Sequence, residues 1–392
     1  MADPTPTPTP TRPLTRAGVQ AARDLIAPYI HTTPILTNAT LSRLASTPQP
    51  PSSTGVPRPA RPTLRLWFKC ENLQRIGAFK VRGAFHAIEQ LKRSPAEWAA
   101  TQSRGVVTHS SGNHAQALAL AAQTSGIPAH IVMPSISAAP KIAATRGYGA
   151  SVVFSGSTST EREAAVAELV AATGARLIPP YDHPDIILGQ GTMGLEMLEQ
   201  VAGLIAAADA ADTTDGDEPS GVNEQDRPPP RTLDAIITPC GGGGMLSGVA
   251  LSCEGTSTRV FGAEPSFEDA DDGKRGYYSG RRIETVKSLT IADGLRTPVG
   301  AIPWSIIYER RLVAGMYSVS EDEIKAALRL VYERMKLVVE PSAVVGLAVA
   351  LYNEDFRAMV EREAGDAGWD LGLVFSGGNV SLEALGNLFA EP

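Results

Sequence analysis

The sequence predicts an α/β fold built on mostly parallel β-sheet, and three observations support this prediction. The chain has 392 residues, which is too many for one compact core and enough for two packed domains. Short apolar runs alternate with helix-type segments along most of its length. Glycine-rich stretches fall where apolar runs end, and ligands of parallel sheets bind beyond the carboxyl ends of the strands. We therefore expect helices on both faces of the sheet and a ligand site at its glycine turns.

The expected elements follow one another as strand, turn and helix. Apolar, β-branched runs closed by glycine turns are typical of buried parallel strands, and alanine-rich segments of twelve or more residues favour helices. We expect strands within residues 104–110, 129–134, 150–156, 232–240, 258–265 and 371–379, and helices within 114–126, 137–150, 160–174 and 241–251.

Composition excludes several classes of function. A net charge of −7 and the absence of a dense Lys/Arg run argue against nucleic acid as a partner. No apolar run reaches the roughly 18 residues of a membrane span, and the N-terminus lacks the apolar core of a secretory signal. The three cysteines are too few for a disulfide framework, so we expect a reduced, cytoplasmic setting.

Three segments have the composition of disordered chain. Residues 1–13 are a Pro/Thr repeat, residues 46–62 are rich in Pro and Ser, and residues 206–231 are acidic and then Pro-rich. Such segments bury too little apolar surface to offset the entropy lost on ordering. We interpret the first as a tail and the other two as surface insertions.

The strongest local signal is the stretch PCGGGGMLSG, residues 239–248. Four glycines follow an expected strand and begin an expected helix, so the backbone can turn tightly and point several N–H groups at an anion. The stretch lacks the Lys-Ser/Thr ending of a nucleoside-triphosphate loop and the GxGxxG spacing of a dinucleotide site. It indicates a phosphate site, and a plain glycine hinge is the alternative.

Two further turns follow expected strands. HSSGNHAQA, residues 109–117, offers hydroxyls, an amide and a helix N-terminus that could hold a carboxylate, although a simple capping turn fits equally well. His114 lies inside the first helical turn, which favours a structural hydrogen bond over a role as a base. VFSGGNVS, residues 374–381, could place a hydroxyl against a ring nitrogen.

The stretch RIGAFKVRGA, residues 75–84, holds Lys80 within a short apolar run. Alone it favours a lysine whose stem packs and whose amine reaches water. Together with the three turns it suggests one ligand that has a phosphate, a polar aromatic ring and an aldehyde for an amine to capture. That ligand is pyridoxal 5′-phosphate, and Lys80 is the expected Schiff-base lysine.

The chain resembles the serine racemase and serine/threonine dehydratase branch of the fold-type II, tryptophan synthase β-like enzymes. The resemblance extends from about residue 15 to 385 and rests on eight motifs in family order: FKCENLQRIGAFKVRGA, VVTHSSGNHAQAL, GQGT, PCGGGGMLSG, GAEPS, IADGL, ERMKLVVEPSAVVG and SGGNV. It implies two open, twisted, mostly parallel sheets flanked by helices. It also implies a small domain, 105–182, and a large domain, 14–104 plus 183–392, with the cofactor between them.

The resemblance implies a role in cofactor binding for several residues. Lys80 bonds to the cofactor, and Phe79 packs beside the ring. Asn113 contacts the 3-oxygen of the ring, and Ser376 hydrogen-bonds the pyridine nitrogen. The backbone N–H groups that hold the phosphate are those of Gly241, Gly242, Gly243, Gly244 and Met245.

It implies a substrate site as well. Arg162 matches an arginine that approaches the substrate when the small domain closes. The loop that grips the substrate carboxylate consists of Ser110, Ser111, Gly112, Asn113 and His114.

Ser111 bears on the choice of reaction. Racemisation needs an acid or base on each face of the α-carbon, and in the similar racemases Lys80 and a serine at the position of Ser111 fill these roles. Many threonine dehydratases have alanine there, whereas 3-hydroxyaspartate dehydratases share the serine. We expect serine racemisation together with loss of water from serine or threonine. The alternatives are a dedicated dehydratase without racemase activity, a β-replacement enzyme and a non-catalytic relative.

The resemblance also implies a cation site and a homodimer. Glu264, the carbonyl of Ala270 and Asp272 offer hard oxygen ligands for Mg²⁺ or Ca²⁺. Two extra residues around Phe267 lengthen this loop relative to the family pattern, and a solvated acidic loop is the alternative. The expected partner is a small amino-acid substrate, with no nucleic acid and no membrane.

Overall fold

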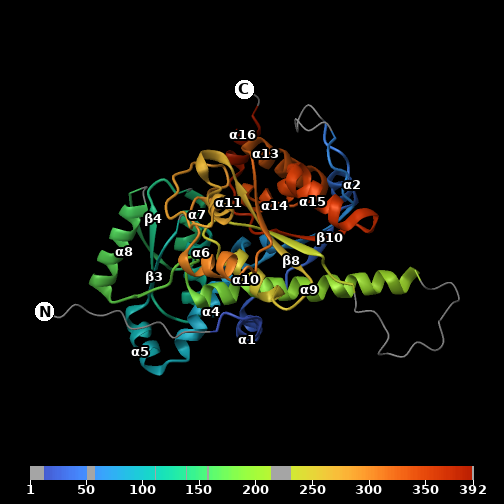
Figure 1. Cartoon of the computed structure of the whole chain (residues 1–392). Coiled ribbons are helices and arrows are strands. Elements are labelled where there is room, and N and C mark those ends of the chain that lie inside the picture. The colour runs from blue at the N-terminus through green and yellow to red at the C-terminus, as the bar shows by residue number, and fades with distance from the viewer. Residues whose placement is uncertain are drawn as a thin grey trace, which may run out of the picture.

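The computed structural model describes residues 13–50, 58–110, 112–137, 139–156, 159–212 and 231–390 (Figure 1). Within these residues the strands form two separate sheets, with the orders β1-β2-β10-β7-β8-β9 and β5-β4-β3-β6. Neighbouring strands run parallel except for β1, which is antiparallel to β2. The predicted class, two open and mostly parallel sheets flanked by helices, is confirmed.

The strands of the two sheets are short, and the central ones are largely buried. The larger sheet contains β1 Ile35–Thr37, β2 Leu64–Cys70, β7 Ala235–Pro239, β8 Arg259–Pro265, β9 Gly315–Val319 and β10 Trp369–Phe375. The smaller sheet contains β3 Val106–His109, β4 Ala129–Pro134, β5 Ser151–Ser155 and β6 Arg176–Leu177. All strands of the smaller sheet lie within 105–182, the segment expected for the small domain, and the domain boundaries themselves stay a prediction.

The smaller sheet is covered on both faces. Val106 packs in a cluster with residues of α4 and α6, while the next residue, Val107, packs in a different cluster with Val166 of α8. Successive side chains of a strand point to opposite faces, so α6 and α8 lie on opposite sides of this sheet. The helices here are α5 Pro95–Arg104, α6 Asn113–Thr124, α7 Ala139–Gly147 and α8 Ser159–Thr173.

The larger sheet shows the same alternation. In β7, Ile236 packs with the cluster of α9 and α10, and Ile237 packs with the cluster of α13 and α14. The apolar runs of β7 and β10 are buried along their whole length, as expected for strands covered on both faces. Its helices and the C-terminal helix are α1 Arg16–Ile26, α2 Ala39–Ala45, α9 Pro184–Asp212, α10 Gly244–Cys253, α11 Asp272–Ser279, α12 Ala301–Trp304, α13 Glu321–Leu330, α14 Val345–Tyr352, α15 Glu354–Ala364 and α16 Leu382–Phe389.

Helix α4, Lys80–Lys92, joins the two halves because it packs against both α9 and α6. Four buried charged side chains anchor α4 to the neighbouring segments. The Arg82 guanidinium donates to Glu71 at 2.8 Å and to Glu196 at 2.7 Å, and the Lys69 amine donates to Glu196 at 2.8 Å. Their side chains are at most 7% exposed. We call these four residues the buried ion network. It anchors α4 at Arg82, two residues after Lys80.

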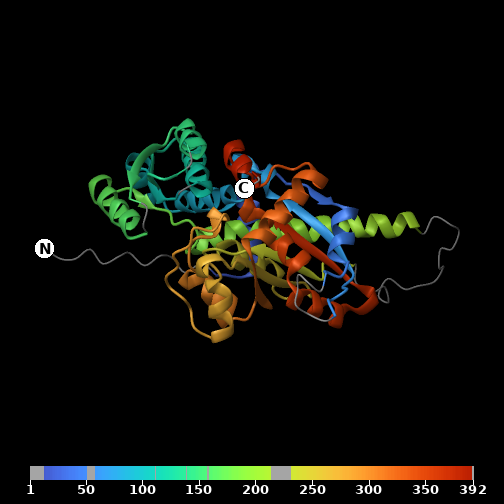
Figure 2. The same cartoon turned by 90° about the horizontal axis from the view of Figure 1, so that it is seen from above.

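Two segments expected to be disordered are partly ordered. Helix α9 continues to Asp212, so residues 206–212 are helical, which follows from the high helix propensity of their alanines. Its end projects past the larger sheet in both views (Figures 1 and 2). At the edges of the other insertion, the buried Arg357 donates hydrogen bonds to the carbonyls of Thr47 and Ala60 and orders both. The remaining parts, 51–57 and 213–230, lie outside the described residues, as do 1–12 of the expected tail.

The described residues contain no helix that is long and apolar enough to span a membrane. Cys70, Cys240 and Cys253 are buried free thiols.

Candidate active site

The turn before Lys80 carries unusual backbone angles. Ile76 has φ 59° and Gly77 has φ 69°, in the left-handed region that a β-branched residue rarely adopts. The Ile76 carbonyl accepts a hydrogen bond from the side-chain amide of Asn379 at 2.8 Å, which holds this strained conformation. The chain then enters α4 at Lys80. The glycine of the RIGAFK stretch therefore serves the turn that aims this lysine.

The Lys80 amine lies inside the protein and is not in the surface position that the stretch alone favours. Nζ donates to the carbonyl of Pro180 at 2.8 Å and lies 5.1 Å from the centre of the Phe79 ring. Burial lowers the pKa of Lys80 from 10.5 to about 8, and the negative charge of Glu340 opposes this shift. Roughly a tenth of the amine is therefore neutral at pH 7, far more than for a lysine of ordinary pKa, and this form can act as a nucleophile or base.

The tetraglycine turn connects β7 to α10. Gly243 has φ 82°, which permits the sharp entry into the helix. Among the described residues, no acceptor faces the backbone N–H groups of Gly241, Gly242, Gly243, Gly244 and Met245. A side chain on Gly242 would overlap the ring of Tyr181, which lies against this turn. Buried N–H groups without acceptors at a helix N-terminus form a site for a phosphate.

Ser376 ends β10 next to the lysine turn. Its carbonyl accepts a hydrogen bond from the Phe79 N–H at 3.0 Å, and a β-bridge joins Ala78 to Gly377. The residue is 4% exposed, and its hydroxyl makes no hydrogen bond to the described residues. Ser376 and Lys80 are therefore neighbours, and a buried hydroxyl remains available to a polar ring atom.

The serine loop ends β3 and begins α6. The Gly112 N–H donates to Ser110 Oγ at 3.2 Å, and Ser111 lies outside the described residues. Asn113 Nδ2 donates to Glu340 at 2.7 Å, and this contact brings the loop to the lysine turn. His114 Nε2 faces the carbonyl of Ile178 at 3.2 Å, and burial lowers its pKa to about 3. His114 is thus neutral and structural.

Arg162 reaches the same region from α8. Its guanidinium interacts electrostatically with Tyr181, and burial lowers its pKa. Since Tyr181 contacts the tetraglycine turn and follows Pro180, the acceptor of Lys80, Arg162 faces the site from the smaller sheet.

The residues expected to hold a cation lie behind the tetraglycine turn. Glu264 accepts from the N–H groups of Gly273 and Lys274, and Asp272 accepts from Val299 at 3.0 Å. Burial of the two acidic groups beside one another raises the pKa of Glu264, and burial raises that of Asp272 to about 7. Asp272 Oδ1 is buried without a partner, and Ala270 is buried in the same loop. The described residues contain no group of three or more His, Cys, Asp or Glu side chains placed to hold a metal, so this prediction rests on two carboxylates and a carbonyl.

Sequence reasoning missed several residues of the site. No motif marked Tyr181, in PPYD, as a site residue, because its role follows only from its contact with the tetraglycine turn. Lys141 forms an ion pair of 2.6 Å with Asp293 and lies against Gly112 of the serine loop. Asp293, Glu340 and Asn379 belong to the motifs IADGL, ERMKLVVEPSAVVG and SGGNV, which marked them without assigning them these contacts.

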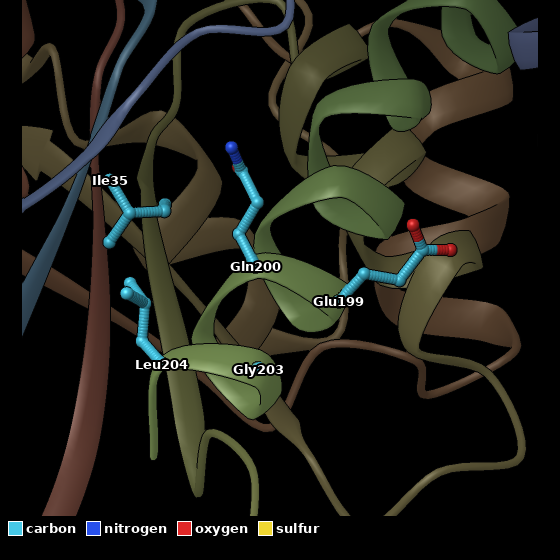
Figure 3. Close-up of a pocket in the computed structure, with 5 residues that line it drawn as sticks. All are labelled: Ile35, Glu199, Gln200, Gly203 and Leu204. Atoms are coloured by element: carbon cyan, nitrogen blue, oxygen red, sulfur yellow. The ribbon is translucent and has the colours of Figure 1, made fainter. Parts of the chain in front are cut away.

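A separate surface pocket of about 390 Å³ lies between β1 and α9, away from these residues. Its lining residues are Ile35, Glu199, Gln200, Gly203 and Leu204 (Figure 3). The Glu199 carboxylate points away from Ile35 and Leu204 and pairs with Arg23 at 2.6 Å.

The residues at the site fit pyridoxal phosphate. The tetraglycine N–H groups suit its phosphate, Ser376 offers a hydroxyl for the ring, and Lys80 offers an amine of lowered pKa. These groups come from the turns after the paired strands β7 and β10 and from the start of α4, where the Phe79 N–H donates to the Ser376 carbonyl.

Comparisons with known proteins agree with this fit. A model of the pyridoxal-phosphate dependent enzyme family matches residues 54–363. Serine racemase of Dictyostelium discoideum is 37% identical over 379 residues, with 96% of this chain and 98% of the relative covered. The L-threo-3-hydroxyaspartate ammonia-lyase of Saccharomyces cerevisiae is 36% identical over 380 residues, with 96% of each covered. The structure of maize serine racemase superposes with a TM-score of 0.76 at 35% identity, covering 95% of this chain and 96% of the other. The chain belongs to the pyridoxal-phosphate dependent enzyme family.

Proposed function

We propose that this enzyme interconverts L- and D-serine and eliminates water from L-serine and L-threonine to give a 2-oxo acid and ammonia. The observation that carries the proposal is the position of the Lys80 amine. It lies beside Pro180, whose neighbour Tyr181 contacts the tetraglycine turn, and it adjoins Ser376 through Phe79. The similarity to serine racemases over nearly the whole chain supports this choice of substrate.

When bound, pyridoxal phosphate withdraws electrons from the α-carbon of an amino acid and makes its proton acidic. The protein positions the group through the tetraglycine N–H groups, Asn113 and Ser376. Ser376 is a neutral partner for the ring nitrogen, whereas a carboxylate would hold that nitrogen protonated and make the ring a stronger electron sink. A neutral partner therefore favours elimination, in which charge leaves with the β-hydroxyl, over transamination.

Two side chains move the α-proton in this proposal. Lys80 Nζ takes the proton from one face of the α-carbon, which its lowered pKa of about 8 permits near neutral pH. Ser111 Oγ returns a proton on the opposite face. The amides of the serine loop and Arg162 hold the substrate carboxylate. His114 does not compete as a base because its ring is buried against Ile178.

A dedicated dehydratase is the second candidate. The yeast 3-hydroxyaspartate ammonia-lyase is as similar to this chain as the racemases are, at 36% identity. Both reactions begin with removal of the α-proton by the same lysine, so they differ in whether Ser111 returns the proton before the β-hydroxyl leaves. β-Replacement and a non-catalytic role receive no support from the presence of Lys80, Ser376 and the serine loop.

The proposal includes three further features that rest on the sequence. These are a Mg²⁺ or Ca²⁺ ion at Glu264, Ala270 and Asp272, a homodimeric state, and a cytoplasmic location. The buried, unpartnered oxygen of Asp272 supports the cation. The free thiols support a reduced setting.

The test measures keto acid and D-amino acid together from L-serine, L-threonine and L-threo-3-hydroxyaspartate with Mg²⁺. Ser111→Ala is compared with wild type and with Ser94→Ala, a control at the start of α5 whose side chain makes no capping bond. We expect D-serine from wild type and from Ser94→Ala, and none from Ser111→Ala, which keeps threonine deamination. Keto acid alone, unchanged in Ser111→Ala, would make the enzyme a dehydratase.

A further inference from the structure

Three polar side chains from distant parts of the chain meet in the active site. Asn379 Nδ2 donates to Asn113 Oδ1 at 2.9 Å and to the Ile76 carbonyl at 2.8 Å. Asn113 Nδ2 donates to Glu340 Oε1 at 2.7 Å. These contacts join the end of β10, the serine loop and the segment before α14 to the turn that precedes Lys80. We call Asn113, Glu340 and Asn379 the amide network.

The hydrogen bonds of this network allow one orientation of each amide. A backbone carbonyl only accepts, so the Ile76 carbonyl requires the nitrogen of Asn379 to face it. The same nitrogen faces Asn113, which must therefore present its oxygen. The nitrogen of Asn113 then faces Oε1 of Glu340, which accepts whether or not the carboxyl group carries a proton on Oε2. One N–H of Asn113 is used by Glu340, and its second N–H remains available.

The amide network packs directly against two backbone glycines. A Cβ on Gly377 would lie 3.0 Å from Glu340 Oε1 and 3.3 Å from Asn113 Nδ2. A Cβ on Gly77 would lie 3.1 Å from Asn379 Oδ1. Both glycines thus admit the network, and its side chains fill the space that any larger residue would take.

Burial raises the pKa of Glu340 to about 7, and the positive charge of Lys141 opposes this shift. Glu340 is 2% exposed, and the nearby cations are Lys141, which pairs with Asp293 at 2.6 Å, and Lys80. Its second oxygen, Oε2, is buried without a partner. Glu340 thus holds the amide of Asn113 through the hydrogen bond to Oε1, and the backbone N–H of Asn379 contacts the same carboxyl group.

We propose that Asn379 and Glu340 are positioning residues, which hold the amide of Asn113 so that its free N–H points at the ring oxygen of bound pyridoxal phosphate. This inference rests on the proposed function, because it takes Asn113 as the ligand of that oxygen. Asn379 sets the orientation from the strained carbonyl of Ile76, and Glu340 reinforces it from the opposite side.

The test titrates each apoenzyme with pyridoxal phosphate and records both the dissociation constant and the absorption spectrum of the bound cofactor. Asn379→Asp is nearly isosteric but cannot donate, so it faces two acceptors and favours the reversed orientation of Asn113. We expect about tenfold to a hundredfold weaker binding and a shifted spectrum, as for one unsatisfied buried hydrogen bond. Glu340→Ala removes the acceptor of the Asn113 amide, and we expect binding weakened by about threefold to tenfold.

The matched control is Asn38→Asp. Asn38 is half-buried, caps α2 through its oxygen, which aspartate retains, and donates through Nδ2 to the carbonyl of Arg334 at 3.2 Å, outside the amide network. Its affinity should equal that of wild type. If Asn379→Asp does not fold, judged by circular dichroism, Asn379→Ala replaces it with the same expected loss. Wild-type affinity and spectrum in the Asn379 variant, or wild-type affinity in Glu340→Ala, would overturn the inference. Failure of the wild-type apoenzyme to bind pyridoxal phosphate would instead refute the proposed function.

Discussion

Glu196→Gln is the substitution that best tests the buried ion network of Lys69, Glu71, Arg82 and Glu196. Wild type buries two cations and two carboxylates, and the glutamine leaves both cations with Glu71 alone. The side chains of Lys69, Arg82 and Glu71 are 0% exposed, so water cannot compensate the charge that remains. Removing one partner of a buried ion pair costs about 3–5 kcal/mol of the free energy of unfolding, and we expect a loss of this size.

The same helix provides a matched control. Glu199 lies three residues further along α9 and pairs with Arg23 at a surface where the two side chains are 59% and 29% exposed. Exposed pairs contribute about 0–1 kcal/mol, so Glu199→Gln should change the free energy of unfolding by less than about 1 kcal/mol. The two variants remove the same charge by the same chemistry and differ only in burial.

Denaturant unfolding, followed by fluorescence and circular dichroism with equal excess of pyridoxal phosphate, measures both variants. A second readout is pH. Burial lowers the pKa of Lys69 in wild type, and loss of Glu196 lowers it further. Between that folded pKa and the unfolded value of 10.5, the unfolded state binds more protons, so the stability of Glu196→Gln should recover as pH rises towards 9. Equal losses in Glu196→Gln and Glu199→Gln, within about 0.5 kcal/mol, would falsify the reasoning.

Three further predictions concern the active site. An amine-reactive reagent should modify Lys80 of the apoenzyme with a midpoint near pH 8, because only the neutral amine reacts; a midpoint near 10.5, mapped by mass spectrometry, would contradict the lowered pKa. Gly242→Ala should weaken pyridoxal phosphate binding at least tenfold, since its methyl group displaces Tyr181 and distorts the phosphate site, whereas Gly203→Ala, in open space on α9, should bind normally; equal affinities would count against the tetraglycine site. Mg²⁺ should raise the melting temperature of wild type but not of Asp272→Asn, as measured by calorimetry after chelation, and no response in wild type would refute the cation site.

The sequence by itself determined the elements and the chemistry. Alternating apolar runs and helical segments predicted parallel sheet covered by helices on both faces, because strand and helix periodicity is set by neighbouring residues. The division into two sheets was implied by the family resemblance. The glycines at 241–244 and the lysine at 80 pointed to a phosphate and an aldehyde; the glycines follow β7, and the lysine begins α4. Each of these predictions depends on a short stretch of residues, so the sequence alone is sufficient to make it. The same reasoning failed at residues 206–212, where the alanines extend α9 although the acidic composition suggested disorder.

Only the tertiary structure decided which side chains meet. Asn113 contacts Glu340 and Asn379 across separations of 227 and 266 residues, and Lys141 reaches Asp293 across 152. Tyr181 joins the site because the chain after β6 passes over the tetraglycine turn. The lowered pKa of Lys80 and the neutral state of His114 likewise follow from burial, and the burial of a single side chain cannot be read from the local sequence. Such contacts depend on how helices pack between two sheets, so the sequence supplied the reactive groups and the packing determined their partners, their charge and their orientation.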